Sequence, residues 1–156
     1  MKYLLISLLF FIYGCSKDTP TASTEPELDT TTKESSAAWT IRRWDGENWI
    51  DTADKLPGST SWRFISYTDT GSQFRIKGGY TIGFTNPSNN DVEFWFSKLI
   101  FMDRGNIPIY TDEFSRITRY VSANGGTDTY QGNFEIYLDN IDIANEITHM
   151  YVWGRA

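Results

Sequence analysis

The feature that most constrains the fold of this chain is an apolar and polar alternation of period two that recurs through most of its length. It is clear in "TSWRFISY", "QFRIKGGYTIGFTN" and "GNFEIYL", which are separated by Gly, Asn and Asp residues. Alternation of this period places successive side chains on opposite faces of a strand, whereas a helix would repeat every three to four residues. About seven to nine such strands without an amphipathic helix predict an antiparallel β-sandwich, with a small barrel as the alternative.

Turn residues predict how some of these strands connect. The pair Asp45-Gly46 predicts a hairpin that joins 39–44 to 49–51, and Asn124-Gly125 predicts a second hairpin near the end of the chain. Gly78-Gly79 marks either a bulge or a break between two strands. These local signals predict neighbours within a sheet but not which strands share one.

One strand is apolar on both faces and is therefore expected at the centre of its sheet. The run "DVEFWFSKLIFMD" places Val92, Phe94 and Phe96 on one face. Strict alternation places Trp95, Leu99 and Phe101 on the other face.

The start of the chain has the layout of a secretory signal. "MKYLLISLLFFIY" has one basic residue, Lys2, followed by an apolar run. This run is shorter than the roughly 20 apolar residues that a membrane-spanning helix needs. We therefore expect residues 1–14 to be a signal peptide that is removed.

The only cysteine, Cys15, follows this run in "IYGC". Residues Ile12 to Cys15 resemble the lipobox of bacterial lipoproteins, with Tyr13 in place of the usual small residue. The resemblance implies that Cys15 becomes the first mature residue and carries diacylglycerol and a further acyl chain such as palmitate. Two or three acyl chains give stable attachment to a lipid bilayer. A lone cysteine cannot form an internal disulfide, and the alternative is a chance cysteine after an ordinary signal.

The next segment is predicted to be a tether. Residues 15–37 are rich in Ser, Thr, Pro and Glu, with Leu28 as the single large aliphatic residue. Such a composition buries too little apolar surface to offset the entropy of ordering, so disorder is expected. The folded domain is then residues 38–156. Lys17 and Asp18 resemble a short charged signal for the outer face of the bacterial outer membrane, which implies an outer-membrane lipoprotein exposed at the cell surface.

Overall charge excludes one class of partner. The chain has 14 Lys and Arg against 20 Asp and Glu, a net charge of −6, and it has no basic stripe. Nucleic-acid binding needs a basic patch. Envelope proteins or glycans remain as the candidate partners.

Part of the domain resembles the immunoglobulin-like FxLyD sandwich domains of bacterial lipoproteins and extracytoplasmic proteins. The resemblance covers about Tyr80 to Trp153. It rests on these positions: Asn86, Phe101 to Asp103, Gly105, Gly132 and Phe134. In this chain the turn glycine, Gly105, stands two residues after Asp103, whereas the family has glycine three residues after the aspartate. The resemblance implies an immunoglobulin-like β-sandwich that acts as an accessory or binding module, and it carries over no catalytic residue.

The tryptophans are the candidate ligand-binding residues. Four of the six lie in the first part of the predicted domain: Trp39, Trp44, Trp49 and Trp62. Trp44 and Trp49 would face each other across the first hairpin, where an exposed, coplanar pair could stack on a sugar ring. Core packing and cross-strand stabilisation of the hairpin explain such residues without a ligand, and this explanation is favoured over ligand binding.

Catalysis is not expected. The only histidine, His149, lies in an alternating strand, and there is no Gly-x-Ser-x-Gly motif. Glu93 and Glu135, on strands expected to be neighbours, could form the carboxylate pair of a glycan-active hydrolase, the less favoured alternative.

No cofactor is expected, and only one loop could suit a metal. "LDNIDIANE" contains Asp139, Asp142 and Glu146, a weak candidate set for Ca²⁺. The loop lacks the spacing of a calcium-binding motif, and a solvated loop with Asx turns is favoured. The sequence thus predicts a membrane-anchored extracytoplasmic lipoprotein with a non-catalytic β-sandwich, serving either ligand binding or an envelope assembly. The alternative is a glycan-binding surface lipoprotein.

Overall fold

The computed structural model describes residues 27–156. The predicted signal peptide, Cys15 and the first part of the predicted tether lie outside the described residues. Within 27–156, no helix has the length and apolar character that crossing a membrane requires.

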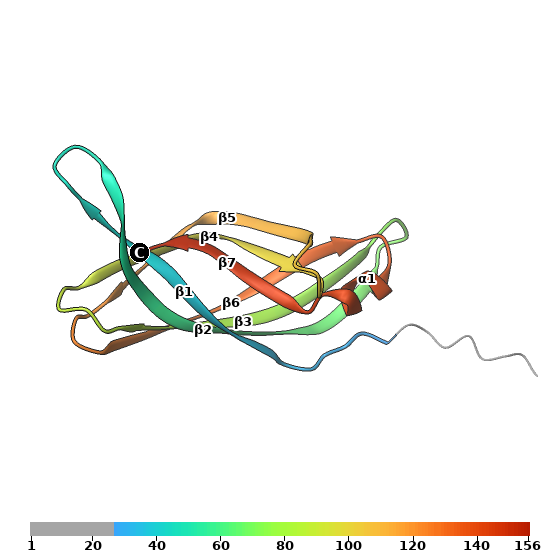
Figure 1. Cartoon of the computed structure of the whole chain (residues 1–156). Coiled ribbons are helices and arrows are strands. Elements are labelled where there is room, and N and C mark those ends of the chain that lie inside the picture. Colours follow the sequence, from blue (N-terminus) through green and yellow to red (C-terminus); the bar gives the residue numbers. More distant parts are fainter. Residues whose placement is uncertain (1–26) are drawn as a thin grey trace, which may run out of the picture.

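Residues 27–156 form an elongated sandwich of two antiparallel sheets (Figure 1). The larger sheet has the strand order β1-β2-β3-β6 and the smaller has the order β5-β4-β7. The elements are β1 (Lys33–Trp44), β2 (Trp49–Asp69), β3 (Phe74–Asn86), β4 (Val92–Met102), β5 (Pro108–Val121), β6 (Gly126–Leu138), α1 (Ile141–Glu146) and β7 (His149–Arg155).

The predicted antiparallel β-sandwich is therefore confirmed, with seven strands in two sheets. Immunoglobulin constant domains have sheets ABED and CFG when strands are lettered in chain order. The present sheets are ABCF and EDG in the same lettering. The likeness to immunoglobulin domains is thus one of two packed antiparallel sheets and not of strand order.

Aromatic side chains from both sheets fill the space between them. Phe84 of β3 packs against Phe94 of β4, with ring centroids 4.6 Å apart. Trp62 of β2 meets Phe101 of β4 edge to face at 5.7 Å. Both Phe94 and Phe101 are fully buried. Edge-to-face and tilted pairs at these distances add to the stability that burial alone provides.

The glycine pair of β3 is associated with a bulge, and β3 itself is unbroken. Its pairing with β2 shifts register between Phe64 and Ser66, opposite Gly78. A Cβ on Gly78 would come within 2.6 Å of the Arg63 carbonyl oxygen and closer still to the Phe134 ring. The missing side chain makes room for Phe134, so Gly78 is required by packing.

The strict alternation predicted for β4 is wrong after Phe96. The register with both neighbouring strands shifts between Phe96 and Lys98. This bulge returns Leu99 and Phe101 to the inner face, where they are fully buried beside Phe96. The expectation that β4 is central in its sheet is met, since it lies between β5 and β7.

The second predicted hairpin is also wrong. β5 pairs with β4, and β6 pairs with β3, so the turn at Asn124-Gly125 carries the chain from one sheet to the other. The N–H groups of Asn124 and Gly125 donate to the carbonyls of Ser88 and Asn86, each at 2.7 Å. The turn is thereby held to the loop between β3 and β4 instead of closing a ladder.

The folded region begins before the predicted boundary at residue 38. β1 starts at Lys33, and Leu28 is buried in the core. The side chain of Asn145 accepts from the N–H of Asp29 and donates to the carbonyl of Glu27, both at 2.9 Å. Residues 27–37 therefore belong to the domain and not to a disordered tether.

The predicted solvated loop contains the short helix α1. The side chain of Asn140 caps it by accepting from the N–H of Asp142, at 2.9 Å. Ile141 and Ala144 point into the core and anchor the helix. The Asx turn was predicted correctly, but the helix that it starts was not.

Candidate ligand-binding hollow

The four tryptophans of the candidate set do not share one surface. Trp39 and Trp62 are 3% and 2% exposed and belong to the core. The indole N–H of Trp39 donates to the carbonyl of Val152 at 3.1 Å and so ties β1 to β7. Because both rings are enclosed between the sheets, Trp39 and Trp62 cannot stack on a ligand, which corrects their inclusion in the predicted site.

Trp44 and Trp49 are exposed at the end of the β1-β2 hairpin, which projects beyond the sandwich (Figure 1). They are 55% and 58% exposed and pair across the two strands as predicted. Their ring centroids lie 5.8 Å apart, but the planes are inclined by 59°. The pair is therefore a wedge and not the coplanar platform that was expected.

The tip of this hairpin is a well-ordered turn. A carboxylate oxygen of Asp45 accepts from the N–H groups of Asn48 and Glu47, at 2.7 and 2.9 Å. These two bonds hold the pKa of the Asp45 carboxyl below its ordinary value. Gly46 has a φ of +111°, a conformation that favours glycine. The turn places Trp44 and Trp49 opposite each other on the two strands.

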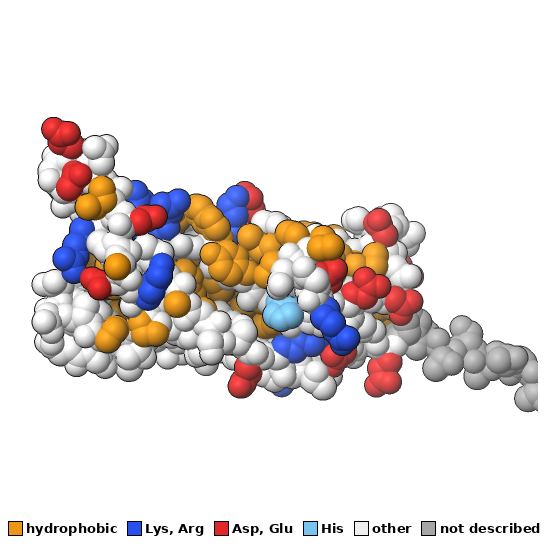
Figure 2. All heavy atoms as spheres, in the orientation of Figure 1, with side chains coloured by type: hydrophobic (Ala, Val, Ile, Leu, Met, Phe, Trp, Pro, Cys, Tyr) orange, Lys and Arg blue, Asp and Glu red, His pale blue; other side chains and the backbone are white. Residues whose placement is uncertain are grey.

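A hollow of about 320 Å³ lies between the base of this hairpin and the outer face of the smaller sheet. We call it the hairpin hollow. It is lined by residues of five strands and the residue after β7: Arg42, Trp49, Glu93, Trp95, Arg116, Arg155 and Ala156. Figure 2 shows hydrophobic side chains gathered on this side of the molecule, over β4 and β7, with Lys and Arg side chains nearer the hairpin.

Cations and indole rings alternate along the outer face of the smaller sheet. The guanidinium carbon of Arg116 lies 4.8 Å from the Trp95 ring centroid, within the range of a cation–π contact. Trp95 meets Trp153 edge to face at 5.5 Å. Trp153 in turn lies between Lys98 and Arg155, at 5.7 and 5.9 Å. These contacts hold the rings in defined orientations.

The charges of the hollow are mostly paired. Arg116 contacts Glu93 at 2.7 Å, and Arg42 contacts Asp51 at 3.2 Å. Arg42 also donates to the backbone carbonyl of Trp49 at 2.8 Å, which links β1 to β2 at the base of the hairpin. Arg155 forms no ion pair with residues 27–156. The hollow thus combines apolar ring faces with hydrogen-bonding groups of both signs, which suits a polar ligand that also has an apolar face.

The residues considered for catalysis are not assembled. Glu93 lies on β4 and Glu135 on β6, in different sheets, so the expectation that their strands are neighbours is wrong. Glu93 is paired with Arg116, and Glu135 lies 4.0 Å from Lys77. A ring nitrogen of His149 lies 2.8 Å from the Thr148 hydroxyl and 3.3 Å from the carbonyl of Asp103. These contacts involve no carboxylate or serine that would form a catalytic relay.

The weak calcium candidate is not supported either. Asp139 accepts from the Gln73 amide at 3.1 Å, and the N–H of Asp142 is used by the cap of α1. Between residues 27 and 156, no three His, Cys, Asp or Glu side chains gather into a set that could hold a metal ion. Asp139, Asp142 and Glu146 therefore do not form a metal site among the described residues.

Sequence reasoning missed Trp95 and Trp153, the two rings at the centre of the aromatic face. A signal was present, because Trp95 has the opposite parity to the buried Phe94 and Phe96. An indole at an outward position of a central strand predicts an apolar outer face. The partner ring on β7 could not be assigned, since nothing in the sequence places β7 beside β4.

The positions that carry the FxLyD resemblance are structural in this chain. Asn86 is fully buried and donates to the carbonyls of Asn90 and Val121, at 2.8 and 2.9 Å. Asp103 accepts from the N–H groups of Gly105 and Ile107, both at 2.8 Å, and closes the turn after β4. The Phe134 ring packs in the core over Gly78. None of these groups belongs to the hollow.

Comparison with known proteins does not assign this chain to a family. The sequence matches no protein-family model and no curated protein. Among solved structures, the chain is similar to a DUF1425 family member from Shewanella sp. pv-4. The identity is 12%, over 76% of this chain and 89% of that one, with a TM-score of 0.30. A similarity at that level carries no argument about this chain, so membership of the FxLyD or lipobox lipoprotein families stays a prediction.

Proposed function

We propose that this chain is an extracytoplasmic lipoprotein, attached to a bilayer through acylated Cys15, whose β-sandwich binds a glycan without catalysis at the hairpin hollow. The observation that carries the proposal is the composition of the hollow. Trp49 and Trp95 offer ring faces for the apolar side of a sugar, while Arg155, Arg116 and Glu93 offer hydrogen bonds to its hydroxyls. A volume of about 320 Å³ is at the lower end of the range for small-molecule sites.

The direction of the hairpin agrees with this role. The described chain begins at one end of the sandwich, near α1, and the β1-β2 hairpin projects at the other end (Figure 1). An anchor upstream of residue 27 would therefore leave the hollow at the end of the domain away from the attachment point. That end is the one that can reach ligands outside the bilayer.

The test begins with the full chain in detergent, screened on a glycan array and then titrated by calorimetry with the best glycan. Replacing Trp49 with Ala removes a ring that lines the hollow and is expected to weaken binding at least about tenfold, the effect of losing a buried contact of about 1.4 kcal/mol. Because Trp49 is more than half exposed, the change should leave the thermal midpoint within about 2 °C of the wild-type value.

Trp44→Ala is the matched control. Trp44 is equally exposed on the same hairpin and touches Trp49, but it does not line the hollow. We expect less than about a threefold change in affinity, because only the support of Trp49 is lost. The proposed site would be refuted if no glycan bound, or if the two substitutions weakened binding equally.

The anchor is tested separately. Cys15→Ser removes the only thiol that could be acylated, so the variant should leave the membrane fraction or keep its signal peptide. Mass spectrometry of the wild-type protein should show a first residue at Cys15 with an acyl mass. An unchanged mass and unchanged membrane fractionation would contradict attachment through Cys15.

A protein partner in an envelope assembly is the second candidate, and one observation favours it. Ile50 is 46% exposed and follows Trp49 on the opposite face of the hairpin, which makes the hairpin apolar beyond the hollow itself. Tryptophan is enriched among the residues that dominate protein interfaces. In this case crosslinking in cells should recover a partner, and both Ile50→Ser and Trp44→Ala should abolish the crosslink. Recovery of monomer alone would exclude the assembly.

A further inference from the structure

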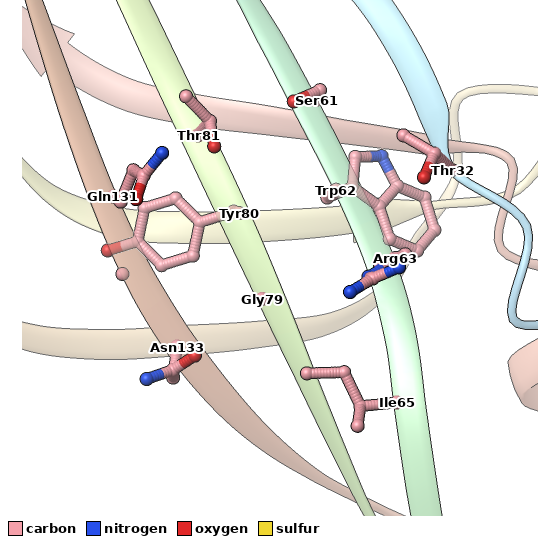
Figure 3. A pocket seen from close by; sticks show the side chains of 11 residues that line it. Thr32, Ser61, Trp62, Arg63, Ile65, Gly79, Tyr80, Thr81, Gln131 and Asn133 are labelled. Carbon is pink, nitrogen blue, oxygen red and sulfur yellow. The ribbon is translucent and has the colours of Figure 1, made fainter.

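The larger sheet has a second concave site, on the outer face of the sandwich opposite the smaller sheet. This trough measures about 400 Å³ and crosses β2, β3 and β6 (Figure 3). Its outward-facing side chains come from these three strands and from the segment before β1: Thr32, Ser61, Arg63, Ile65, Thr81, Gln131 and Asn133. The trough is separate from the hairpin hollow and shares no lining residue with it.

The floor of the trough is open because Gly79 has no side chain. Figure 3 shows Gly79 on β3 with Arg63 on one side and Asn133 on the other. A Cβ at Gly79 would meet its nearest atoms, in Asn133, Ile65 and Gly132, at 3.6 to 3.8 Å, which is ordinary contact. Neither packing nor a positive φ requires glycine there.

Gly78 and Gly132 differ from Gly79, because packing leaves no room for a side chain at either of them. A Cβ at Gly78 would overlap Phe134, and one at Gly132 would come within 2.6 Å of the Tyr80 hydroxyl oxygen. Those two glycines are explained by the core. Glycine inside a strand is unfavourable, and where packing does not require it, it often marks a bulge or the close approach of a ligand or another backbone. Gly79 pairs with Arg63 beside the bulge of β2, and its missing side chain leaves the floor of the trough open to a ligand.

The chemistry of the trough limits the ligand. Hydroxyl and carboxamide groups supply both donors and acceptors, and no Asp or Glu is among the lining residues. Arg63 is the only charged lining residue, and it forms no ion pair with residues 27–156. In a chain of net charge −6, an arginine left unpaired among neutral polar groups favours a single anionic group on the ligand. A guanidinium binds a carboxylate with two parallel hydrogen bonds.

We infer that this trough binds an acidic sugar, a hexuronic-acid unit of a glycan, with its ring over Gly79 and its carboxylate at Arg63. Side chains of Thr81, Gln131 and Asn133 then reach the sugar hydroxyls from β3 and β6. Because the trough is shallow and open, binding is expected to be weak and to depend on ionic strength.

The test compares two probes on the full chain in detergent: a galacturonic-acid trisaccharide and a neutral galactose trisaccharide of the same linkage. Binding is followed by calorimetry, and stability by thermal unfolding. The wild-type protein should bind the acidic probe at least about tenfold more tightly. Arg63→Gln should remove this preference, since the amide keeps hydrogen-bonding capacity without the charge.

Gly79→Val places a side chain in the floor of the trough and should weaken binding of the acidic probe at least about tenfold. The thermal midpoint should stay equal or rise by about 2 °C, because the backbone there accepts a side chain. Thr85→Val, on the same face of β3 but outside the trough, is the matched control and should leave affinity unchanged.

Trp49→Ala, which tests the hairpin hollow, should also leave the affinity of the acidic probe unchanged, so the two sites are distinguished. The inference is overturned if the wild-type protein binds neither probe or binds both equally. It is equally overturned if Gly79→Val binds as the wild-type protein does.

Discussion

Replacement of Trp39 by Phe tests the division of the tryptophans into core and surface. Two losses follow from the structure. The carbonyl of Val152 loses its 3.1 Å hydrogen bond from the indole, which costs about 1 kcal/mol. The smaller ring leaves roughly 40 Å³ empty, which at about 24 cal/mol per Å³ costs about 1 kcal/mol more. The free energy of unfolding should fall by about 2 kcal/mol.

The measurement is equilibrium unfolding in urea, followed by far-ultraviolet circular dichroism because the substitution alters tryptophan fluorescence. With a denaturant dependence of about 2 kcal/mol per molar urea, the midpoint should fall by about 1 M. Trp44→Phe is the control, since Trp44 is 55% exposed and should change the free energy by less than about 0.5 kcal/mol. Equal effects of the two substitutions, or no effect of Trp39→Phe, would refute the assignment of Trp39 to the core.

Three further changes test other parts of the fold in the same assay. Gly78→Ala should destabilise by about 2 kcal/mol because its methyl group overlaps Phe134 and the Arg63 carbonyl, whereas Gly79→Ala should not destabilise. Leu28→Ala should cost about 2 kcal/mol, and no change would mean that residue 28 belongs to a tether. Burial raises the pKa of Asp112, so its charge is unfavourable in the folded state at neutral pH. Asp112→Asn should therefore stabilise at pH 7, with a gain that shrinks as the pH falls through the raised pKa toward 4 and the wild-type carboxyl protonates; an equal gain at both pH values would contradict this.

Local signals predicted local structure well. Strand identity follows from alternation within six to eight residues, and the hairpin at Asp45-Gly46 was correct because its two strands pair directly through a short turn. The turn at Asn124-Gly125 has similar residues, yet it joins two sheets. A turn motif predicts only that the chain reverses its direction. Which ladder the next strand joins depends on contacts with β3 that are distant in sequence.

The error in β4 has a different physical source. Alternation assigns faces by counting, and one inserted residue reverses every later assignment. Between Phe96 and Leu99 the strand contains such a bulge, and the inner face then continues with Leu99 and Phe101. The apolar character of the strand was read correctly. Its faces could be assigned only after the register with β5 and β7 was known.

The candidate site was only half predictable for the same reason. Trp44 and Trp49 were identified because their relation is local to one hairpin. The hollow also requires Trp95, Arg116 and Arg155, which come together through the pairing of β4 with both of its neighbours. Such a constellation exists only in the assembled sheet, so no single stretch of the sequence could indicate it.

The outer faces of the two sheets differ in the side chains that they carry. An antiparallel sheet with one solvated face is expected to carry polar residues there. The larger sheet does so with Ser61, Thr81 and Gln131 in its trough. The smaller sheet instead carries the half-buried rings of Trp95 and Trp153 beside the cations of Arg116 and Lys98. Indole faces at outward positions of a sheet offer apolar contact area to a ligand, and for that reason the hairpin hollow is the first site to probe with ligands.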